Sequence, residues 1–135
     1  MKGQLTGMRG VYLVSAELAR RGLIASPTSR SAMGADILVT DQACLRTFSV
    51  QVKTNARTFN FWLVGEKPMV SPSHIYVLVN LRPTKAGELV EYFVVPSQVI
   101  AKNTKREPRR NSVWYAVYRK DLADYRDAWS VFGGS

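Results

Sequence analysis

The sequence has little of what extracellular and membrane proteins depend on. Cys44 is the single cysteine among 135 residues, so the chain cannot form an internal disulfide, and it suits a reducing cytoplasm. No base lies near Cys44 in the sequence, so we expect a small packing residue. No apolar run approaches the ~20 residues of a membrane-spanning helix, and residues 1–6 lack the apolar core of a signal peptide. We therefore expect a cytoplasmic protein without a membrane partner.

Acidic residues are scarce as well. The chain has 10 aspartates and glutamates against 19 lysines and arginines, which gives a formal net charge of +9 at pH 7. A charge of this sign favours polyanionic partners such as nucleic acid. Charge alone does not identify the partner, because many basic domains bind ribosomes or acidic proteins. The length predicts one domain, residues 1–135, and a hydrophobic content of 46% is enough to build its core.

Hydrophobic periodicity predicts an α/β fold, in which a helix precedes a mixed sheet. The first helix spans residues 8–21 and ends at Gly22. Its buried stripe consists of Val11, Leu13, Val14 and Leu18. Runs rich in β-branched and aromatic residues predict the strands. These strands are expected at 23–26, 36–40, 47–53, 74–81, 90–95 and 113–117, and at 59–64, where an aromatic flap is the alternative.

The C-terminal part is expected to contain two more helices. Ser97 follows a strand and is the expected N-cap of a short helix, 98–102. A last helix over 121–129 places Leu122, Tyr125 and Trp129 on one stripe. Together these elements predict a mixed central sheet that is flanked by helices.

Polar side chains at the start of one strand and inside the next form the main candidate site. Asp36 opens the strand 36–40, while Gln51 and Lys53 lie within the strand 47–53. The connection between the two strands has the length of a hairpin loop. Residues two apart in a strand share a face, so Gln51 and Lys53 project together and can meet the Asp36 carboxylate. The pattern predicts a one-metal phosphodiesterase site.

The residue types fit that chemistry. Asp36 offers a hard anionic oxygen, while Gln51 and the backbone carbonyl of Val52 offer neutral oxygens, and such ligands suit Mg²⁺ or Mn²⁺. Lys53 could orient a water molecule and stabilise the charge of the transition state. Glu17, on the first helix, could hold metal-bound waters or a second ion. Glu17 and Asp36 together would balance one divalent cation, and Gln51 should make binding weaker than in an all-carboxylate site.

Each of these residues also has an interpretation without chemistry. Glu17 borders the buried stripe of its helix and could be a solvated edge residue. Asp36 could simply cap a strand after the turn at Gly34. Gln51 and Lys53 could form the solvent face of an edge strand.

Taken together, the residues resemble the PD-(D/E)XK nuclease superfamily. That pattern is a helix with Glu, a strand opening with Asp, and a strand bearing Glu-x-Lys or Asp-x-Lys. Here it reads Glu17, then Gly34-Ala35-Asp36-Ile37-Leu38-Val39, then Ser49-Val50-Gln51-Val52-Lys53-Thr54. Order and spacing are similar to those of archaeal Holliday-junction resolvases and related small nucleases, over about the first 80 residues.

The resemblance implies a restriction-endonuclease-like αβββαβ core and divalent-metal-dependent cleavage of phosphodiester bonds, usually in DNA. It also implies a role in repair, recombination or defence, and a homodimer, since dimers are common among such nucleases. Gln51 departs from the pattern, although some homing endonucleases of the superfamily use Gln there. The alternative is a catalytically inactive nucleic-acid-binding module with the same fold. A third interpretation, an interaction or immunity-type protein, is disfavoured by the net charge of +9.

Further residues are candidates for contacts with nucleic acid. Ser29 and Arg30 could bind a phosphate beside the scissile bond, or form a solvated turn. Thr54 and Asn55 follow Lys53 and could touch the substrate, although turn formation explains them equally well. A basic segment near the C-terminus could straddle a phosphate backbone, or be a solubilising loop. It carries Lys102, Lys105, Arg106, Arg109 and Arg110.

Aromatic residues and the lone histidine give weaker signals. Trp62, Trp114 and Trp129 could stack on bases, but core packing is expected at least for Trp129. His74 begins a strand and has no partner in the sequence, so we expect a structural role.

Overall fold

The computed structural model describes residues 2–29 and 35–133. Helix α1 (Lys2–Arg20) is followed by a five-stranded sheet with the strand order β1-β2-β3-β5-β6. Neighbouring strands are antiparallel except β3 and β5, which are parallel. The strands are β1 (Ile24–Pro27), β2 (Ile37–Thr40), β3 (Thr47–Asn55), β5 (His74–Thr84) and β6 (Gly87–Pro96). The predicted mixed sheet is confirmed.

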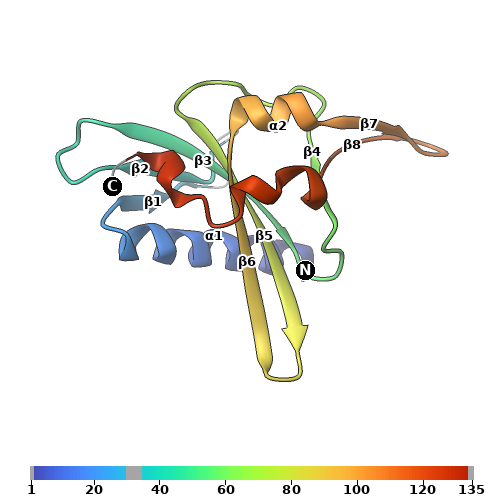
Figure 1. Ribbon diagram of the computed structural model, residues 1–135, viewed down its shortest axis with the longest axis horizontal. Coiled ribbons are helices and arrows are strands. Elements are labelled where there is room, and N and C mark those ends of the chain that lie inside the picture. The colour runs from blue at the N-terminus through green and yellow to red at the C-terminus, as the bar shows by residue number, and fades with distance from the viewer. Residues whose placement is uncertain (1, 30–34, 134–135) are drawn as a thin grey trace.

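A second, smaller sheet was not predicted as such. It has the order β4-β8-β7 and consists of β4 (Phe61–Val64), β8 (Val113–Tyr118) and β7 (Lys105–Pro108). Helix α2 (Ser97–Asn103) leads from β6 into this sheet, and the 3₁₀ helices η1 (Arg119–Tyr125) and η2 (Trp129–Phe132) close the chain. Figure 1 shows two hairpins, β5–β6 and β7–β8, that extend beyond the body of the protein.

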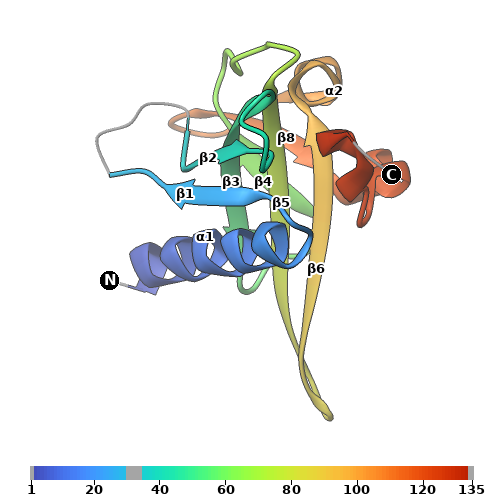
Figure 2. The same cartoon turned by 90° about the vertical axis from the view of Figure 1, so that its left-hand side faces the viewer.

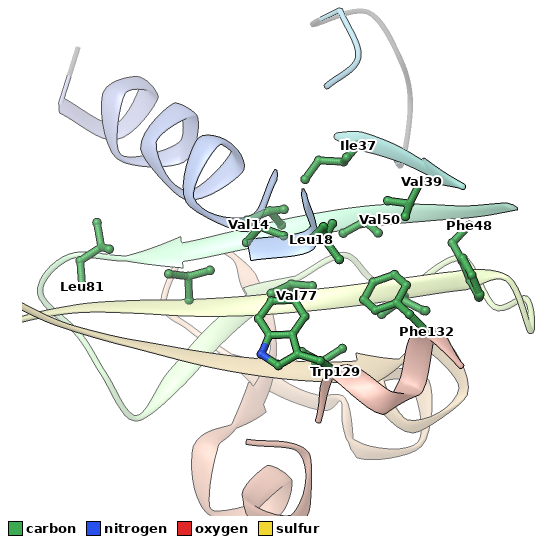
Figure 3. Close-up of a cluster of buried hydrophobic side chains, with 14 residues drawn as sticks. Val14, Leu18, Ile37, Val39, Phe48, Val50, Val77, Leu81, Trp129 and Phe132 are labelled. Atoms are coloured by element: carbon green, nitrogen blue, oxygen red, sulfur yellow. The ribbon is translucent and has the colours of Figure 1, made fainter. Parts of the chain in front are cut away.

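The first core cluster lies between α1 and the five-stranded sheet. Helix α1 packs against β1 and β3 (Figure 2). Its Val14 and Leu18 are fully buried, as predicted, and meet strand residues such as Val50 and Val77 (Figure 3). Side chains alternate along a strand, so the residues between these strand positions face the other side. The α1 face is mostly apolar, and the polar candidates Gln51, Lys53 and Asn55 lie on the opposite face, whereas Thr54 lies on the α1 face beside Gly10.

The second core cluster covers that opposite face over β5 and β6. It joins Trp62 of β4 to Tyr76, Leu78 and Phe93 of the large sheet, with Leu122 of η1. The Trp62 indole N–H donates to the Val79 carbonyl at 3.1 Å. A tryptophan buried and bonded in this way is a core residue and not a platform for bases.

Helix α1 begins six residues earlier than predicted, at Lys2 rather than at residue 8. The segment before residue 8 contains Gly3 and Gly7, which weaken the local signal for a helix. Once the packed turns around Val14 and Leu18 have formed, each added residue gains one hydrogen bond, so the helix propagates toward its N-terminus.

The predicted helix 121–129 is wrong. The chain instead forms η1 and η2, and between them Asp127 adopts a φ of 52°. Arg126 pairs with Phe93 of β6, Leu122 packs in the second cluster, and Trp129 packs in the first. The segment therefore crosses the edge of β6 from one face to the other, which a continuous helix could not do.

The structure also corrects two smaller expectations and decides between alternatives for two segments. Ser97 does not cap α2 with its side chain; its buried Oγ donates to the Ser71 carbonyl at 2.8 Å and accepts from the Ser71 amide at 2.9 Å. The basic segment is not a plain loop, because it contains β7. Cys44 is exposed, with a φ of 58°, so it is not a packing residue. The segment 59–64 forms a strand, β4, and not a flap.

The crossover between the parallel strands differs from the αβββαβ order. Parallel neighbours need a crossover connection, most often a helix. Here the chain between β3 and β5 passes through β4, and α2 follows β6 instead. Within the residues described, none of the helices is long and apolar enough to span a membrane.

Candidate active site

Asp36 lies where the ladder between β2 and β3 ends. The last paired residues are Ile37 and Val50, while β3 continues to Asn55 and stays paired with β5 on its other edge. The Asp36 amide donates to the Val50 carbonyl at 2.7 Å. Its carboxylate Oδ2 accepts a hydrogen bond from the Val52 amide at 2.8 Å. The carboxylate is thus held beside the open edge of β3.

Two residues that carry neutral oxygens, Val52 and Gln51, adjoin Asp36. The N–H and C=O of one strand residue point to the same side, so the Val52 carbonyl faces the open edge that Asp36 occupies. Gln51 follows Val50, and Asp36 precedes Ile37, so Asp36 and Gln51 are neighbours across the end of the ladder. The structure brings together the three residues whose oxygens were expected to bind a metal.

Gln51 and Lys53 share the face of β3 that points away from α1. Both are half-buried, and they alternate with the buried Val50 and Val52. In the part of the chain that is described, neither side chain makes a hydrogen bond or an ion pair. The amide and the ammonium therefore keep their full capacity to interact with a ligand.

His74 lies on the same face, opposite Ser49 of β3. It is buried, and its Nδ1 shares a hydrogen bond with Ser49 Oγ at 2.6 Å, whereas its Nε2 has no partner within residues 2–29 and 35–133. Burial lowers the pKa of His74, and the hydrogen bond to Ser49 and the charge of Asp36 offset this only in part. His74 is thus neutral at pH 7 and packs under the site.

Glu17 is not brought to Asp36. It forms ion pairs with Arg20 at 3.0 Å and with Arg21 at 3.4 Å, and its charge acts on Tyr92 of β6. The hydrogen bond from Arg20 lowers the pKa of Glu17, and burial only partly offsets this. We therefore leave Glu17 out of the metal ligands.

The position of Glu17 along α1 explains this correction. The α1 residues that line the cleft beside Asp36 lie between Gly3 and Tyr12, and Glu17 lies six residues beyond Val11, which is one of them. Six residues of helix correspond to about 9 Å along the axis and to a different face. Among the described residues, no group of three or more His, Cys, Asp or Glu side chains could hold a metal. Among the described residues that line the cleft, Asp36 is the sole carboxylate.

Two adjoining clefts follow the open edge of β3 past the N-terminal half of α1. The first, of about 620 Å³, is lined by Asp36, Val52 and Ser29 together with α1 residues. The second, of about 700 Å³, is lined by Thr54, Asn55 and the turn that follows them. Gly3 borders both clefts. The structure thus brings Ser29, Thr54 and Asn55 to one groove with Asp36, while Arg30 lies outside the described residues.

Sequence reasoning missed two features of this groove. Arg57, in the turn after β3, lines the second cleft and is exposed. Gly10 lies so close to β3 that a Cβ there would sit 1.8 Å from Thr54 Oγ1. The second feature explains why α1 carries a glycine in its middle, which is otherwise unfavourable by ~1 kcal/mol.

The basic segment lies away from Asp36. In Figure 1 the β7–β8 hairpin is at the opposite end of the long axis from β2. Lys105 pairs with Asp121 at 3.2 Å, and the Arg109 guanidinium stacks on Trp114 at 4.5 Å. The remaining cations of the segment are exposed and face solvent; they are Lys102, Arg106 and Arg110.

The fold is restriction-endonuclease-like: a mixed sheet of five strands, with α1 over the strands that carry the candidate site. The solved structure of Hjc, a Holliday junction resolvase from the archaeal hyperthermophile Archaeoglobus fulgidus, is similar to it with a TM-score of 0.60. The likeness covers 94% of this chain and 100% of that chain at 12% sequence identity, which establishes the fold alone. No known protein family profile and no curated protein sequence matches the chain.

Proposed function

We propose that this protein is a divalent-metal-dependent nuclease that acts on DNA. The observation that carries the proposal is the position of Asp36. Its carboxylate accepts a hydrogen bond from the Val52 amide of β3, where the β2–β3 ladder ends, and Gln51 and Lys53 lie on the same strand as Val52. This arrangement lies in a fold that resembles that of a Holliday junction resolvase.

The oxygens at this position fit a hard cation. Asp36 keeps Oδ1 for a metal, since Oδ2 accepts from Val52, and Gln51 and the Val52 carbonyl add two neutral ligands. Mg²⁺ commonly takes few protein ligands and retains several waters, so three oxygens are sufficient. When bound, Mg²⁺ or Mn²⁺ supplies Lewis-acid polarisation of a phosphate oxygen. Lys53 stabilises the negative charge that develops on the phosphate.

The groove beside α1 is the expected path of the nucleic acid. Ser29 and Arg57 offer a hydroxyl and a guanidinium group to a phosphate backbone, and such contacts do not select a sequence. Thr54 and Asn55 shape the groove instead, because the Thr54 hydroxyl is buried and the Asn55 amide donates to Phe61 and Asn80. The β7–β8 hairpin adds exposed cations at a second position. With a net charge of +9, binding should weaken steeply as salt is raised. Homodimer formation and a cytoplasmic location remain predictions.

A catalytically inactive nucleic-acid-binding module is the second candidate. The observation that favours it is the small number of acids: Gln51 replaces a carboxylate, and no acid is found among the described α1 residues that line the cleft beside Asp36. One carboxylate binds a divalent cation more weakly than two or three. Both candidates share the fold and the basic surface, and they differ in cleavage.

A cleavage assay with three labelled DNA substrates separates the two candidates. Single-stranded, duplex and four-way-junction DNA are incubated with Mg²⁺ or Mn²⁺ and with wild type, Asp36→Ala or Lys53→Ala. We expect metal-dependent cutting that both variants abolish while DNA binding persists. Glu17→Gln is the matched control, since it removes an acid outside the site and should leave cleavage unchanged. Binding without cutting would support the inactive module, and neither binding nor cutting would contradict both proposals.

A further inference from the structure

A second charged centre lies on the same face of the sheet, around Glu91 of β6. The Glu91 side chain is 1% exposed, and three guanidinium groups reach its Oε2: Arg119 at 2.7 Å, Arg82 at 3.3 Å and Arg126 at 3.5 Å. Asn80 donates to Oε1 at 3.1 Å. We call Glu91 and its three arginines the arginine cluster.

The arginine cluster keeps an excess of positive charge. Burial raises the pKa of Glu91, but the hydrogen bonds from Arg119 and Asn80 and the charges of Arg119 and Arg82 outweigh it, so the pKa lies below its ordinary value. Glu91 is therefore ionised at pH 7, and one negative charge faces three positive ones. A single arginine would have been enough to compensate the buried carboxylate, so two charges remain for another partner.

The guanidinium groups are held in place before any ligand arrives. Arg82 stacks on Phe59 at 5.2 Å, and Arg119 lies over Phe93 at 5.6 Å. The backbone of Arg126 forms an isolated β-bridge with Phe93 of β6. Such packing restricts flexible side chains, which reduces the entropy that a ligand would have to remove. The cluster is therefore preorganised.

The arginine cluster is also open to solvent and has unused donors. The side chains of Arg82, Arg119 and Arg126 are 38%, 34% and 46% exposed. Each guanidinium has five N–H donors, whereas Glu91 Oε2 accepts one hydrogen bond each from Arg82 and Arg119 and forms an ion pair with Arg126 at 3.5 Å. Arg119 Nε is buried, and no hydrogen-bond partner for it is found in the described chain. Planar forks of this kind match the oxygens of a phosphate.

We propose that the arginine cluster binds a backbone phosphate of the nucleic acid at a distance from the scissile bond; this inference rests on the proposed function. Asn55 of β3 donates to Asn80 of β5 at 3.4 Å, and Asn80 donates to Glu91, so side chains connect the strand of Lys53 to the cluster. Asn55 and Glu91 are separated by two strand spacings, about 10 Å. That distance corresponds to roughly three nucleotides along one strand of B-DNA.

The short segment that leads into β4 separates the two positions. The carbonyls of Phe59 and Phe61 accept hydrogen bonds from Asn80 and Asn55, and the Arg119 amide donates to the Asn60 carbonyl. Because Asn55 of β3 and the Arg119 amide are both bonded to it, this segment holds the strand that carries Lys53 at a fixed distance from Arg119. A nucleic acid that crosses it would contact Lys53 with one phosphate and the arginine cluster with another.

Metal-free DNA binding tests the proposal without requiring cleavage. The affinity of wild type, Arg82→Gln and Arg126→Gln for a fluorescent duplex is measured by anisotropy over a range of salt concentrations. Loss of one phosphate contact should lower the salt slope by about 0.9 and the affinity by about eightfold at 0.1 M salt. Arg20→Gln is the matched control, because it removes the same charge from an exposed ion pair on α1. An equal loss in Arg20→Gln would overturn the site.

A titration with inorganic phosphate separates failure of this site from failure of the proposed function. The side-chain Nε–H signals of arginine are followed by ¹⁵N NMR in the wild-type protein. Larger shifts for Arg82, Arg119 and Arg126 than for Arg20 would support the site even if the protein bound no DNA, a result that would contradict only the nuclease. Uniform shifts across all arginines would overturn the site, whatever the cleavage assay gives.

Discussion

Two carboxylates of this protein, Asp36 and Glu91, lie in opposite electrostatic environments. Asp36 lies at an open strand edge and accepts a hydrogen bond from one neutral donor, the Val52 amide. Glu91 is buried and surrounded by three arginines. A carboxylate bonded to neutral donors keeps its charge for a cation. One that is outnumbered by guanidinium groups leaves a positive field for an anion. The difference assigns the metal to the first region and a phosphate to the second.

The largest expected effect concerns the stability of the arginine cluster. Glu91→Gln leaves three guanidinium groups around a neutral amide, and losing one partner of a buried ion pair typically costs 3–5 kcal/mol; partial exposure of the arginines places the expected loss at about 3 kcal/mol. Asp36→Asn should change the free energy of unfolding by less than ~1 kcal/mol, because the Val52 hydrogen bond can persist. Urea denaturation measures both. Equal losses would remove the contrast between the two carboxylates.

The next effect concerns the wall of the groove beside Asp36. Gly10→Ala forces a methyl group against Thr54, so we expect a loss of about 1–3 kcal/mol in the free energy of unfolding. Gly7→Ala is the matched control, because nothing lies within 4 Å of a Cβ there. Its higher helix propensity should stabilise α1 by ~1 kcal/mol. Thermal unfolding of the two variants distinguishes them, and a stabilised Gly10→Ala would contradict the close approach of α1 to β3.

A third prediction sharpens the assignment of the metal. Gln51→Glu adds a second negative charge beside Asp36, so the dissociation constant for Mg²⁺ should fall by about tenfold, equivalent to 1.4 kcal/mol. Isothermal titration calorimetry measures it directly. Glu17→Gln should leave Mg²⁺ binding unchanged, since that acid is paired with Arg20 and Arg21. Unchanged affinity in Gln51→Glu would exclude Gln51 from the ligands.

The smallest expected effect depends on pH. Burial lowers the pKa of His74 from 6.5 in the folded state. Below pH 6.5 the unfolded chain therefore binds more protons than the folded one, and stability falls as the pH is lowered toward the folded-state pKa. His74→Gln should therefore reduce the stability difference between pH 7 and pH 5. Glu17, Glu88 and Glu91 have pKa values lowered from 4.5, so the stability that they contribute is lost mainly below pH 5, outside this window. If His74→Gln and wild type show the same stability difference between pH 7 and pH 5, the lowered pKa of His74 would be contradicted.

Local patterns predicted the elements that carry the candidate site. The stripe of Val14 and Leu18 marked a buried helix face, and alternation in β3 placed Gln51 and Lys53 on one face, as found in the structure. Asp36 was expected at the start of a strand, and it lies immediately before β2. These predictions succeed because helix and strand periods are properties of neighbouring residues.

Contacts between distant segments were not accessible in the same way. Spacing alone could not show that the N-terminal part of α1 would line the cleft beside Asp36 while Glu17 lies near Tyr92 of β6, because the answer depends on how the helix docks. The periodic stripe of Leu122 and Trp129 predicted one helix, but the two residues pack on opposite faces of the sheet.

The sequence by itself determined the basic character of the protein, the buried face of α1 and the pairing of Gln51 with Lys53 on one strand face. Composition and short-range periodicity are sufficient for these properties. Only the tertiary structure decided that the Val52 amide holds Asp36 at an open strand edge, and that Arg82, Arg119 and Arg126 converge on Glu91. Those residues come from separate strands and from a segment that crosses a sheet edge, so only the folded chain brings their charges within a few ångströms of one another.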